Sequence, residues 1–475
     1  MKKKKIKNPL IRRIPRELLG DWKKYLVVAL FLILTIGFVS GMYVANESML
    51  VAANEGVTKY KLEDGHFELD KKADETLLAA IETGTKADVK QYYLDKAKKE
   101  LDEKLDEKAY PEAYDKAWDK IVEEIDDKYA DAEEKYELND PDFTEVPVKV
   151  YENFFRNEEE DYNNDGEAEG NIRVYAKNDN VDLACLLDGA FPEKADEIAI
   201  DRMYADNNSL KIGDTLDDGT KSWTITGLVA LSDYSCLFQS NNDSMFDAVK
   251  FGVGVVTDEE FDSLDQDKLQ YNYAWTYNEK PQTELEEKNV SEDLMKAMGK
   301  VVTLENFVPQ YQNQAIIFTG DDMGSDKAMM IMLLYIIIVI MAFVFGITTS
   351  NTIAKEAGVI GTLRASGYTK NELIRHYMTL PVIVTLVGAL IGNILGYTAF
   401  KDVCAGMYYG SYSLPTYVTI WNAEAFLMTT VVPVIIMFVV NYAVLHHKLK
   451  LSPLKFLRRD LSSRKQRRAV YLSPR

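Results

Sequence analysis

The stretch AMMIMLLYIIIVIMAFVFGITT, residues 328–349, decides the fold, because an uncharged apolar run of this length can cross a bilayer as a helix. Three further apolar runs of similar length occupy residues 25–45, 377–399 and 423–445. Residues typical of membrane interfaces flank the runs: Lys23, Lys24, Lys327, Lys401, Trp421 and Lys448. The sequence therefore predicts a membrane protein with four transmembrane helices and disfavours a soluble protein with long core helices.

The spacing of these runs, one span followed by a long segment and three spans, predicts one large extracytoplasmic domain. Lys and Arg cluster in residues 1–24, 350–376 and 446–475, as they do in cytoplasmic segments. Residues 46–327 and the short loop 400–422 then lie outside, and both termini are cytoplasmic in a multi-pass protein of the plasma membrane. The first run is longer than the apolar part of a signal peptide and lacks a cleavage site, so we expect it to stay uncleaved.

Residues 46–327 combine helical and strand patterns. In residues 87–137 apolar side chains recur at helical spacing on both sides of Pro111, which predicts two antiparallel helices in a helical hairpin. This hairpin is equally compatible with docking of an external partner and with a solvated insertion. Short β-rich runs separated by turn signals fill residues 145–320 and predict an α+β core. At the other end of the chain, residues 1–24 contain a basic amphipathic helix, suited to the inner membrane interface.

Charge and cysteine content limit the possible partners. The formal net charge is -20, although the predicted cytoplasmic segments are basic, so the acidic residues concentrate in the predicted outer domain. Such a surface repels nucleic acid and attracts cations or cationic ligands. Three cysteines, Cys185, Cys236 and Cys404, are too sparse for a disulfide framework. A Cys185–Cys236 bond and buried free thiols both stay open, and free thiols fit the pattern better.

The loop between the second and third predicted spans reads KEAGVIGTLRASGYTKNELIR, residues 355–375. Its apolar residues predict a short amphipathic helix that ends at Gly367. Thr369, followed by Glu372 three residues later, has the spacing of a capping box and predicts a new helix start. A helix–break–helix element on the inner membrane face is suited to receive a push from a cytoplasmic partner.

This loop resembles the signature of FtsX/MacB-type ABC transporter permeases, which is close to Glu-Ile-Gly-x-Leu-Arg-Ala-x-Gly. Six positions match the signature: Ile360, Gly361, Leu363, Arg364, Ala365 and Gly367. The sequence departs from it at Val359, where the family usually has the Glu, and Glu356 lies one turn earlier. The order of spans is also similar to that family, and the chain resembles the N-terminal half of longer tandem permeases, as a half-size or a truncated form.

The resemblance implies a permease subunit of the mechanotransmission type, which passes ATP-driven motion of a separate ATPase to its external domain. The implied function is export or clearance of a peptide, a lipid or another amphiphile. The residues implied to couple to the ATPase are Glu356, Ile360, Gly361, Leu363, Arg364 and Gly367. The implied partners are an ABC ATPase, a second permease subunit, identical or different, and membrane lipids.

No Gly-x4-Gly-Lys-[Ser/Thr] phosphate loop occurs in the sequence, so we expect no ATP hydrolysis by this chain. No catalytic residue and no cofactor of its own are expected, because ATP would be bound by the partner subunit. A different class of function stays open: a membrane receptor or scaffold without transport, or a regulator of an external cell-wall enzyme.

Small residues in the third predicted span mark a helix-packing face. Gly388, Gly392 and Gly396 lie four residues apart, so another helix can approach this face closely. The partner helix could belong to the same chain or to a second copy, and the same chain is the favoured alternative.

One acidic segment copies the start of an EF-hand loop, with oxygen ligands at Asp161, Asn163 and Asp165 and a glycine at the bend. The twelfth position is Ile172 instead of the bidentate Glu, so a solvated acidic turn is favoured over calcium binding. The four histidines and three cysteines are dispersed and predict no transition-metal site.

Overall fold

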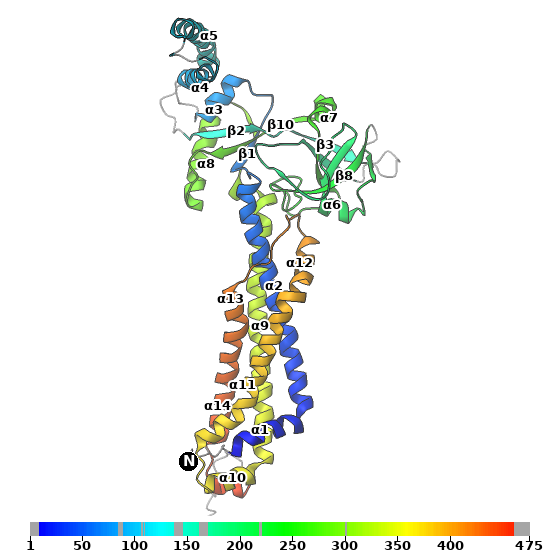
Figure 1. Ribbon diagram of the computed structural model, residues 1–475, viewed down its shortest axis with the longest axis vertical. Helices are drawn as coiled ribbons and strands as arrows, with labels where there is room; N and C mark the ends of the chain where they lie inside the picture. The colour runs from blue at the N-terminus through cyan, green and yellow to red at the C-terminus, as the bar shows by residue number, and fades with distance from the viewer. Residues whose placement is uncertain are drawn as a thin grey trace, which may run out of the picture. The chain divides into compact units, whose positions relative to one another are not determined.

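The computed structural model describes residues 9–83, 89–105, 108, 110–136, 146–160, 170–217, 221–299 and 302–459. The chain forms two compact units (Figure 1). The helix unit comprises Met1–Ser48, Met323–Met407 and Thr419–Arg475. The sheet unit comprises Met49–Asp322 and Tyr408–Val418.

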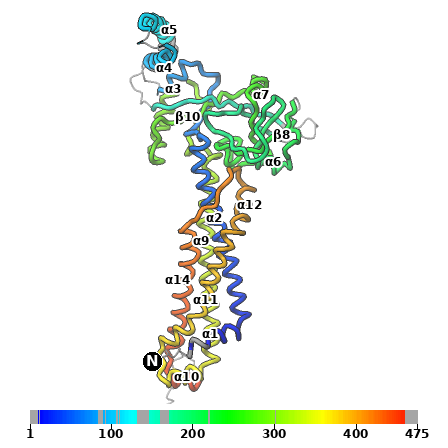
Figure 2. The backbone as a smooth tube through the Cα atoms, viewed as in Figure 1, coloured from blue at the N-terminus to red at the C-terminus, as the bar shows by residue number. Residues whose placement is uncertain are grey.

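Among the described residues, four helical stretches are long and apolar enough to cross a membrane: Trp22–Lys59, Gln314–Lys355, Lys370–Tyr409 and Ala423–Lys448 (Figure 2). Each contains one of the predicted spans. The elements of the helix unit, in chain order, are α1 (Pro9–Gly20), α2 (Trp22–Lys59), α9 (Gln314–Lys355), α10 (Ala357–Ala365), α11 (Lys370–Leu395), the π-helical turn η3 (Gly396–Phe400), α12 (Lys401–Tyr409), α13 (Ala423–Phe426), the π-helical turn η4 (Leu427–Val431), α14 (Val432–Lys448) and α15 (Pro453–Leu457).

The inside of the helix unit is apolar, and much of its outside is apolar as well. Buried side chains of α2, α9, α11 and α14 form one core: Val28, Leu32, Ile36, Val39, Leu334, Ile338, Ala342, Phe345, Val384, Ala389 and Met437. Large apolar side chains on the same helices, among them Ile340, Phe343 and Ile394, stay at least half exposed. A continuous apolar exterior of this kind suits contact with lipid. The four apolar helices and the sheet-rich mixed domain together fit a membrane protein with an extracellular domain.

A buried amide joins three elements of the helix unit. Asn393 Oδ1 accepts hydrogen bonds from Ser40 Oγ of α2 at 2.9 Å and from Thr429 Oγ1 of η4 at 2.8 Å. Asn393 Nδ2 donates to Thr430 Oγ1 at 3.0 Å and to the carbonyl oxygen of Ala389 at 2.8 Å. Because every polar atom of this amide has a partner, it fixes how the helices pack.

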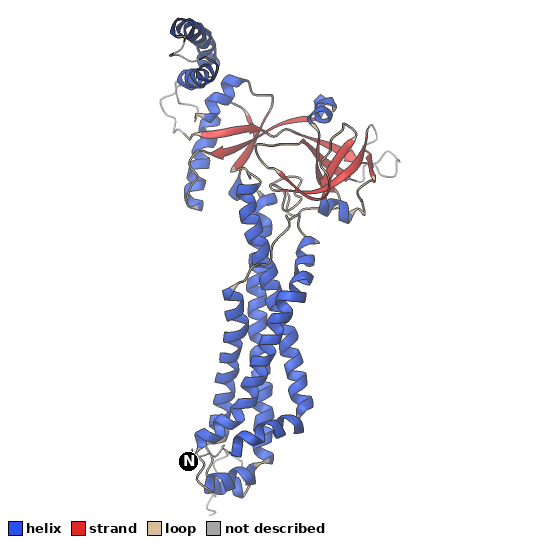
Figure 3. Ribbon diagram, in the orientation of Figure 1, coloured by secondary structure: helices blue, strands red, loops and turns tan. Residues whose placement is uncertain are grey.

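The described part of the sheet unit contains an 11-stranded mixed sheet, whose strands are red in Figure 3. The strand order is β11-β1-β10-β3-β4-β9-β6-β8-β5, with β2 on β10 and β7 on β8. The strands are β1 (Gly65–Leu69), β2 (Val148–Glu152), β3 (Phe155–Glu160), β4 (Gly170–Ala176), β5 (Ala184–Gly189), β6 (Glu197–Asp201), β7 (Thr215–Asp217), β8 (Ser222–Leu231), β9 (Phe251–Val256), β10 (Leu269–Tyr277) and β11 (Leu304–Pro309). The β4–β9 and β6–β8 pairs are parallel. Strand β10 pairs with β1 and β2 along most of its length and with β3 through Leu269 and Gln270, so it joins two groups of strands.

Helices of the sheet unit are α3 (Glu75–Glu82), α4 (Val89–Lys104), α5 (Pro111–Tyr136), α6 (Arg202–Asn207), α7 (Asp258–Ser263) and α8 (Glu284–Met298), with 3-10 turns η1 (Gln266–Lys268) and η2 (Gln310–Gln312). Helices α3 and α8 cover an aromatic core that contains Phe67, Tyr273 and Trp275. Helices α4 and α5 run in opposite directions side by side, because Tyr114 donates to Asp102 at 2.5 Å while Lys90 pairs with Asp126 at 2.6 Å.

The structure extends two of the predicted elements. Helix α2 continues to Lys59 and α9 begins at Gln314, so each contributes residues to both units. The sequence placed the span limits where hydropathy ends, which is a property of the bilayer and not of the helix. The predicted outer loop 400–422 is also partly helical, and Tyr408–Val418 belongs to the sheet unit, where Arg202 donates to the carbonyl oxygens of Tyr409 and Tyr412 at 2.8 Å.

Two buried carboxyl groups make the sheet unit sensitive to pH. Burial raises the pKa of Asp201 to about 6, and burial together with the charge of Glu63 raises the pKa of Asp233 to about 7. A carboxyl group whose pKa is higher in the folded state stabilises the fold while it is protonated. This contribution is complete below the ordinary pKa near ~4 and is lost as the pH rises to about 7.

We therefore expect Asp233→Asn to gain stability relative to wild type as the pH rises from 5 to 8, because the amide never has to ionise. Thermal unfolding of both full-length proteins in detergent, followed at both pH values, measures this difference. A difference in Tm that stays constant with pH, or shrinks, would show that Asp233 ionises freely in the folded protein.

Candidate functional site

The predicted coupling loop forms α10 and the start of α11. Gly367 ends the first helix with a φ of +102°, a backbone conformation that favours glycine. Thr369 begins the second, where its side chain and that of Glu372 form a reciprocal capping box. The helix–break–helix element expected from the sequence is therefore present. Gly367 ends its first helix and Thr369 begins its second, as predicted.

Two of the implied coupling residues face the inside of the helix unit. Ile360 is fully buried in an apolar cluster with Leu373, Leu445 and Phe456. Gly361 lies against α15, since a Cβ atom added there would come within 2.8 Å of Leu457 Cγ and 3.0 Å of the Leu457 backbone nitrogen. Both residues hold α10 on α15 instead of contacting solvent.

Arg364 and Leu363 also point toward the chain itself. Arg364 Nη1 donates to the carbonyl oxygen of Leu451 at 2.6 Å, and that of Leu449 lies at 3.4 Å. These carbonyls follow the end of α14, where no further helical turn supplies donors. Leu363 is half-buried at the edge of the Ile360 cluster. Arg364 therefore fastens α10 to the end of α14.

Glu356, the residue one turn before the usual family position, joins α10 to two other helices. Its carboxylate accepts hydrogen bonds from Arg13 of α1 and from the Tyr377 hydroxyl of α11, both at 2.8 Å. Helices α1 and α11 also contact each other directly, because Glu17 Oε1 lies 3.1 Å from His376 Nε2. The basic amphipathic helix predicted near the N-terminus is thus α1, and it is attached to the loop through Glu356.

The surface that remains exposed is a stripe on the other side of α10. We call it the α10 face: Lys355, Val359, Thr362, Ala365 and Ser366, all exposed. The hydroxyl groups of Thr362 and Ser366 donate to carbonyl oxygens of their own helix, so they do not need solvent partners. Val359 is 47% exposed, where the family signature usually has Glu. The signature residues that pack inward hold α10 in the orientation that exposes this face. The sequence alone did not show which residues lie on which side of the helix.

The comparison with known families concerns the same region. Residues 331–449 match the model of the FtsX-like permease C-terminal family. We call these residues the FtsX-like domain, after the family that they match. This domain spans most of α9 and all of α10, α11 and α14, and so includes the α10 face. No curated protein shows significant similarity to the chain.

Within the FtsX-like domain, two glycines of α11 and the first residue of η3 lie against α2 of the same chain. A Cβ atom added at Gly388, Gly392 or Gly396 would come within 3.2 Å, 3.0 Å and 2.8 Å of Leu32, Ile36 and Ser40, respectively. The contact continues on α2, where Gly37 and Gly41 lie against Phe400. The two helices therefore share a close-packed contact lined by small residues on both sides, which we call the glycine contact.

We expect Arg364→Ala to loosen the end of α14 and the neighbouring helix α15. The change leaves the partly buried Leu451 carbonyl without its donor, and loss of such a hydrogen bond costs about 0.5–1.5 kcal/mol. Hydrogen exchange of residues 449–457 in the full chain should become faster. Arg375→Ala, which removes an exposed arginine from α11, is the matched control and should leave this exchange unchanged. Equal exchange in the two variants would contradict the fastening role of Arg364.

The remaining predicted site residues form no site in the part of the chain that the structure describes. The calcium candidates Asp161, Asn163 and Asp165 lie outside the described residues. Among the residues described, no group of His, Cys, Asp and Glu side chains has an arrangement that could hold a metal ion. Cys185, Cys236 and Cys404 are buried free thiols, and burial raises the pKa of Cys236 to about 12.

Proposed function

We propose that this chain is the permease subunit of an ABC transporter of the mechanotransmission type. A separate cytoplasmic ATPase binds the α10 face, and its ATP-driven motion is passed through the helix unit to the extracytoplasmic sheet unit. The movement exports or clears a peptide, a lipid or another amphiphile. The observation that carries this proposal is the FtsX-like domain, which contains α10, α11 and α14.

The contacts of α10 suit a helix that transmits force. On its inner side α10 is fastened to α15 at Gly361, to the end of α14 through Arg364 and to α1 and α11 through Glu356. A push on the α10 face is therefore delivered to several helices at once. Helices α2 and α9 each contain residues of both units, so each is one continuous helix from the helix unit into the sheet unit. Motion of the helix unit can therefore be passed along these helices.

Membrane orientation and partners follow from the same proposal. The basic segments that precede α2, include α10 and follow α14 lie in the cytoplasm, so both termini and the α10 face are available to an ATPase. ATP is bound and hydrolysed by that subunit, and this chain takes no part in the chemistry. A second permease subunit, identical or different, completes the transporter.

The alternative function is a membrane receptor, a scaffold or a regulator of an external cell-wall enzyme. The acidic composition that attracts cationic ligands fits this alternative equally well. The two classes differ at the α10 face, because a receptor or scaffold has no need of an ATPase there.

Co-purification in detergent tests the proposal. The full chain is co-expressed with each candidate ABC ATPase subunit, and the purified material is assayed for subunit ratio and ATP hydrolysis. We expect one ATPase to be retained in a fixed ratio and to hydrolyse ATP, while the chain alone hydrolyses none. Retention of no ATPase, with a correctly folded chain, would favour the receptor or scaffold.

A further inference from the structure

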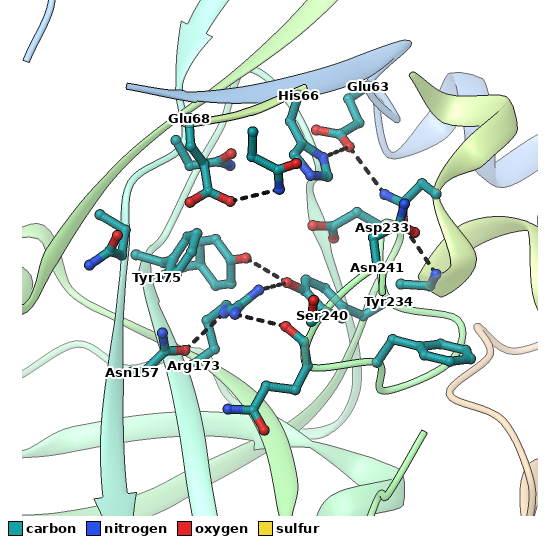
Figure 4. Close-up of a pocket in the computed structure, with 18 residues that line it drawn as sticks. Glu63, His66, Glu68, Asn157, Arg173, Tyr175, Asp233, Tyr234, Ser240 and Asn241 are labelled. Carbon is teal, nitrogen blue, oxygen red and sulfur yellow. Dashed lines mark hydrogen bonds and ion pairs between the residues drawn. The ribbon is translucent and has the colours of Figure 1, made fainter. Parts of the chain in front are cut away.

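A polar cavity of about 230 Å³ lies within the sheet unit (Figure 4). Strands β1, β3, β4, β10 and β11 contribute to its wall, together with residues 233–241 and 313–315. One water molecule needs only about 10–15 Å³ of such volume, so the cavity has room for a small organic group.

Two buried oxygen atoms of the cavity wall lack hydrogen-bond donors. Asp233 is 6% exposed and Asn272 is 5% exposed, and within the described part of the chain no group bonds to Oδ1 of either residue. The orientation of the Asn272 amide is fixed, because its Nδ2 donates to the carbonyl oxygen of Asn153 at 3.1 Å and a flipped amide would set two oxygens face to face. A buried acceptor without a donor is costly, so the cavity wall needs donors that the described chain does not supply.

The charged donors of the cavity, on Arg173 and His66, already contact protein atoms. The three nitrogens of Arg173 donate to Asn157 Oδ1 at 3.0 Å, to the Tyr234 hydroxyl at 2.7 Å and to the Gln239 carbonyl oxygen at 3.0 Å. His66 Nδ1 lies 2.6 Å from Glu63 Oε1. An anionic ligand would have to compete for these donors, whereas a ligand that donates hydrogen bonds finds free acceptors.

The charged groups of the cavity also favour a ligand that donates hydrogen bonds. Glu63, Glu68 and Asp233 all line it, and Figure 4 shows Glu68 and Asp233 on opposite sides of the space beneath His66. Asp182 lies behind Glu63 and accepts a hydrogen bond from its backbone nitrogen at 2.9 Å. Burial and the charge of Glu63 raise the pKa of Asp233 to about 7, although the charges of His66 and Arg173, which also line the cavity, act in the opposite direction.

We propose that this cavity binds a primary ammonium group, which donates hydrogen bonds to Asp233 Oδ1, Asn272 Oδ1 and the Glu68 carboxylate. An ammonium group has three donors and no acceptor, which matches two unpaired oxygens and a carboxylate, that of Glu68, which accepts one hydrogen bond from Asn306 at 3.2 Å. A metal ion is disfavoured, since the described residues offer no suitable ligand set. The amine is either a small free molecule or a lysine side chain of a peptide. This inference goes beyond the proposed function and does not depend on ATPase coupling.

Isothermal titration of the full chain in detergent at pH 8 tests the inference with defined probes. Putrescine represents a free amine, and Nα-acetyl-lysinamide represents a peptide side chain. Two relatives of putrescine serve as controls: 1,4-butanediol is neutral, and the hexamethyl bis-quaternary analogue keeps the charge but has no N–H donor. We expect saturable binding of putrescine, of the lysine derivative or of both, with no binding of the diol and binding of the quaternary analogue at least about tenfold weaker.

Three variants locate the binding. Asp233→Asn should weaken amine binding at least about tenfold, and Glu68→Gln should weaken it less, because Glu68 is only half-buried. Asp196→Asn, the same change at an exposed aspartate of the sheet unit, should bind as wild type. If Asp233→Asn does not fold, Glu68→Gln decides the outcome. Equal binding by wild type and the cavity variants would overturn the inference. Binding of the quaternary analogue as tight as that of putrescine would overturn it too, because either result would mean that surface charge alone attracts the amine.

Discussion

Replacement of Gly41 by leucine should prevent the helix unit from assembling. A Cβ atom at this position would lie 2.6 Å from Phe400 Cβ and 2.8 Å from the Lys401 backbone nitrogen, so a side chain meets backbone that cannot move without displacing η3. Overpacking a core usually costs about 1–3 kcal/mol, and contact with backbone raises that cost. Because the glycine contact extends along α2 and α11, the loss should affect both helices.

The matched control is Gly406→Leu, in α12, where an added Cβ atom would meet nothing within 4 Å. Size-exclusion chromatography in detergent and limited proteolysis measure assembly. Gly41→Leu should yield aggregated or rapidly cleaved protein, and Gly406→Leu should behave as wild type. A monodisperse, protease-resistant Gly41→Leu variant would show that the helices do not pack through the glycine contact.

The second large effect concerns the α10 face. Val359→Lys places in the middle of the proposed ATPase interface a charge opposite in sign to the Glu that is usual in the family signature, and burying an unpaired charge costs several kcal/mol. We expect ATPase recovery with this variant to fall at least about tenfold. The fold should be unaffected, because Val359 is 47% exposed.

Val249→Lys is the control for this variant, since it makes the same change at a valine of the sheet unit that is 52% exposed. It should recover as much ATPase as wild type. A change at Gly361 would not serve, because any side chain there displaces Leu457 and α15. Undiminished ATPase recovery with Val359→Lys would place the contact elsewhere on the chain.

The sequence predicted those features that depend on local constraints. A bilayer requires about 20 apolar residues in a row, which hydropathy detects directly, and each predicted span lies within one apolar helix. The capping signals at Gly367 and Thr369 act within one turn, so they too could be read without the fold. The FtsX-like resemblance, based on the 355–375 loop, agrees with the family match over residues 331–449.

The sequence did not predict which neighbours these residues have. Arg364 is bonded to carbonyl oxygens of residues far along the chain, at 449 and 451, and no local pattern reveals such a contact. The same limit applies to the amine cavity, where Asp233 and Asn272 are contributed by a loop and a strand separated by other elements. Buried polar atoms without partners can be recognised only after the surrounding chain is placed.

The central claim is that ATP-driven motion reaches the sheet unit through the α10 face. Hydrogen exchange of the full chain in complex with its ATPase, measured with and without a non-hydrolysable ATP analogue, tests this claim most directly. We predict that the analogue changes exchange within residues 49–322 of wild type and not in a chain whose ATPase contact is weakened by Val359→Lys. An ATPase that binds the chain and the nucleotide while exchange in residues 49–322 stays the same would contradict the claim.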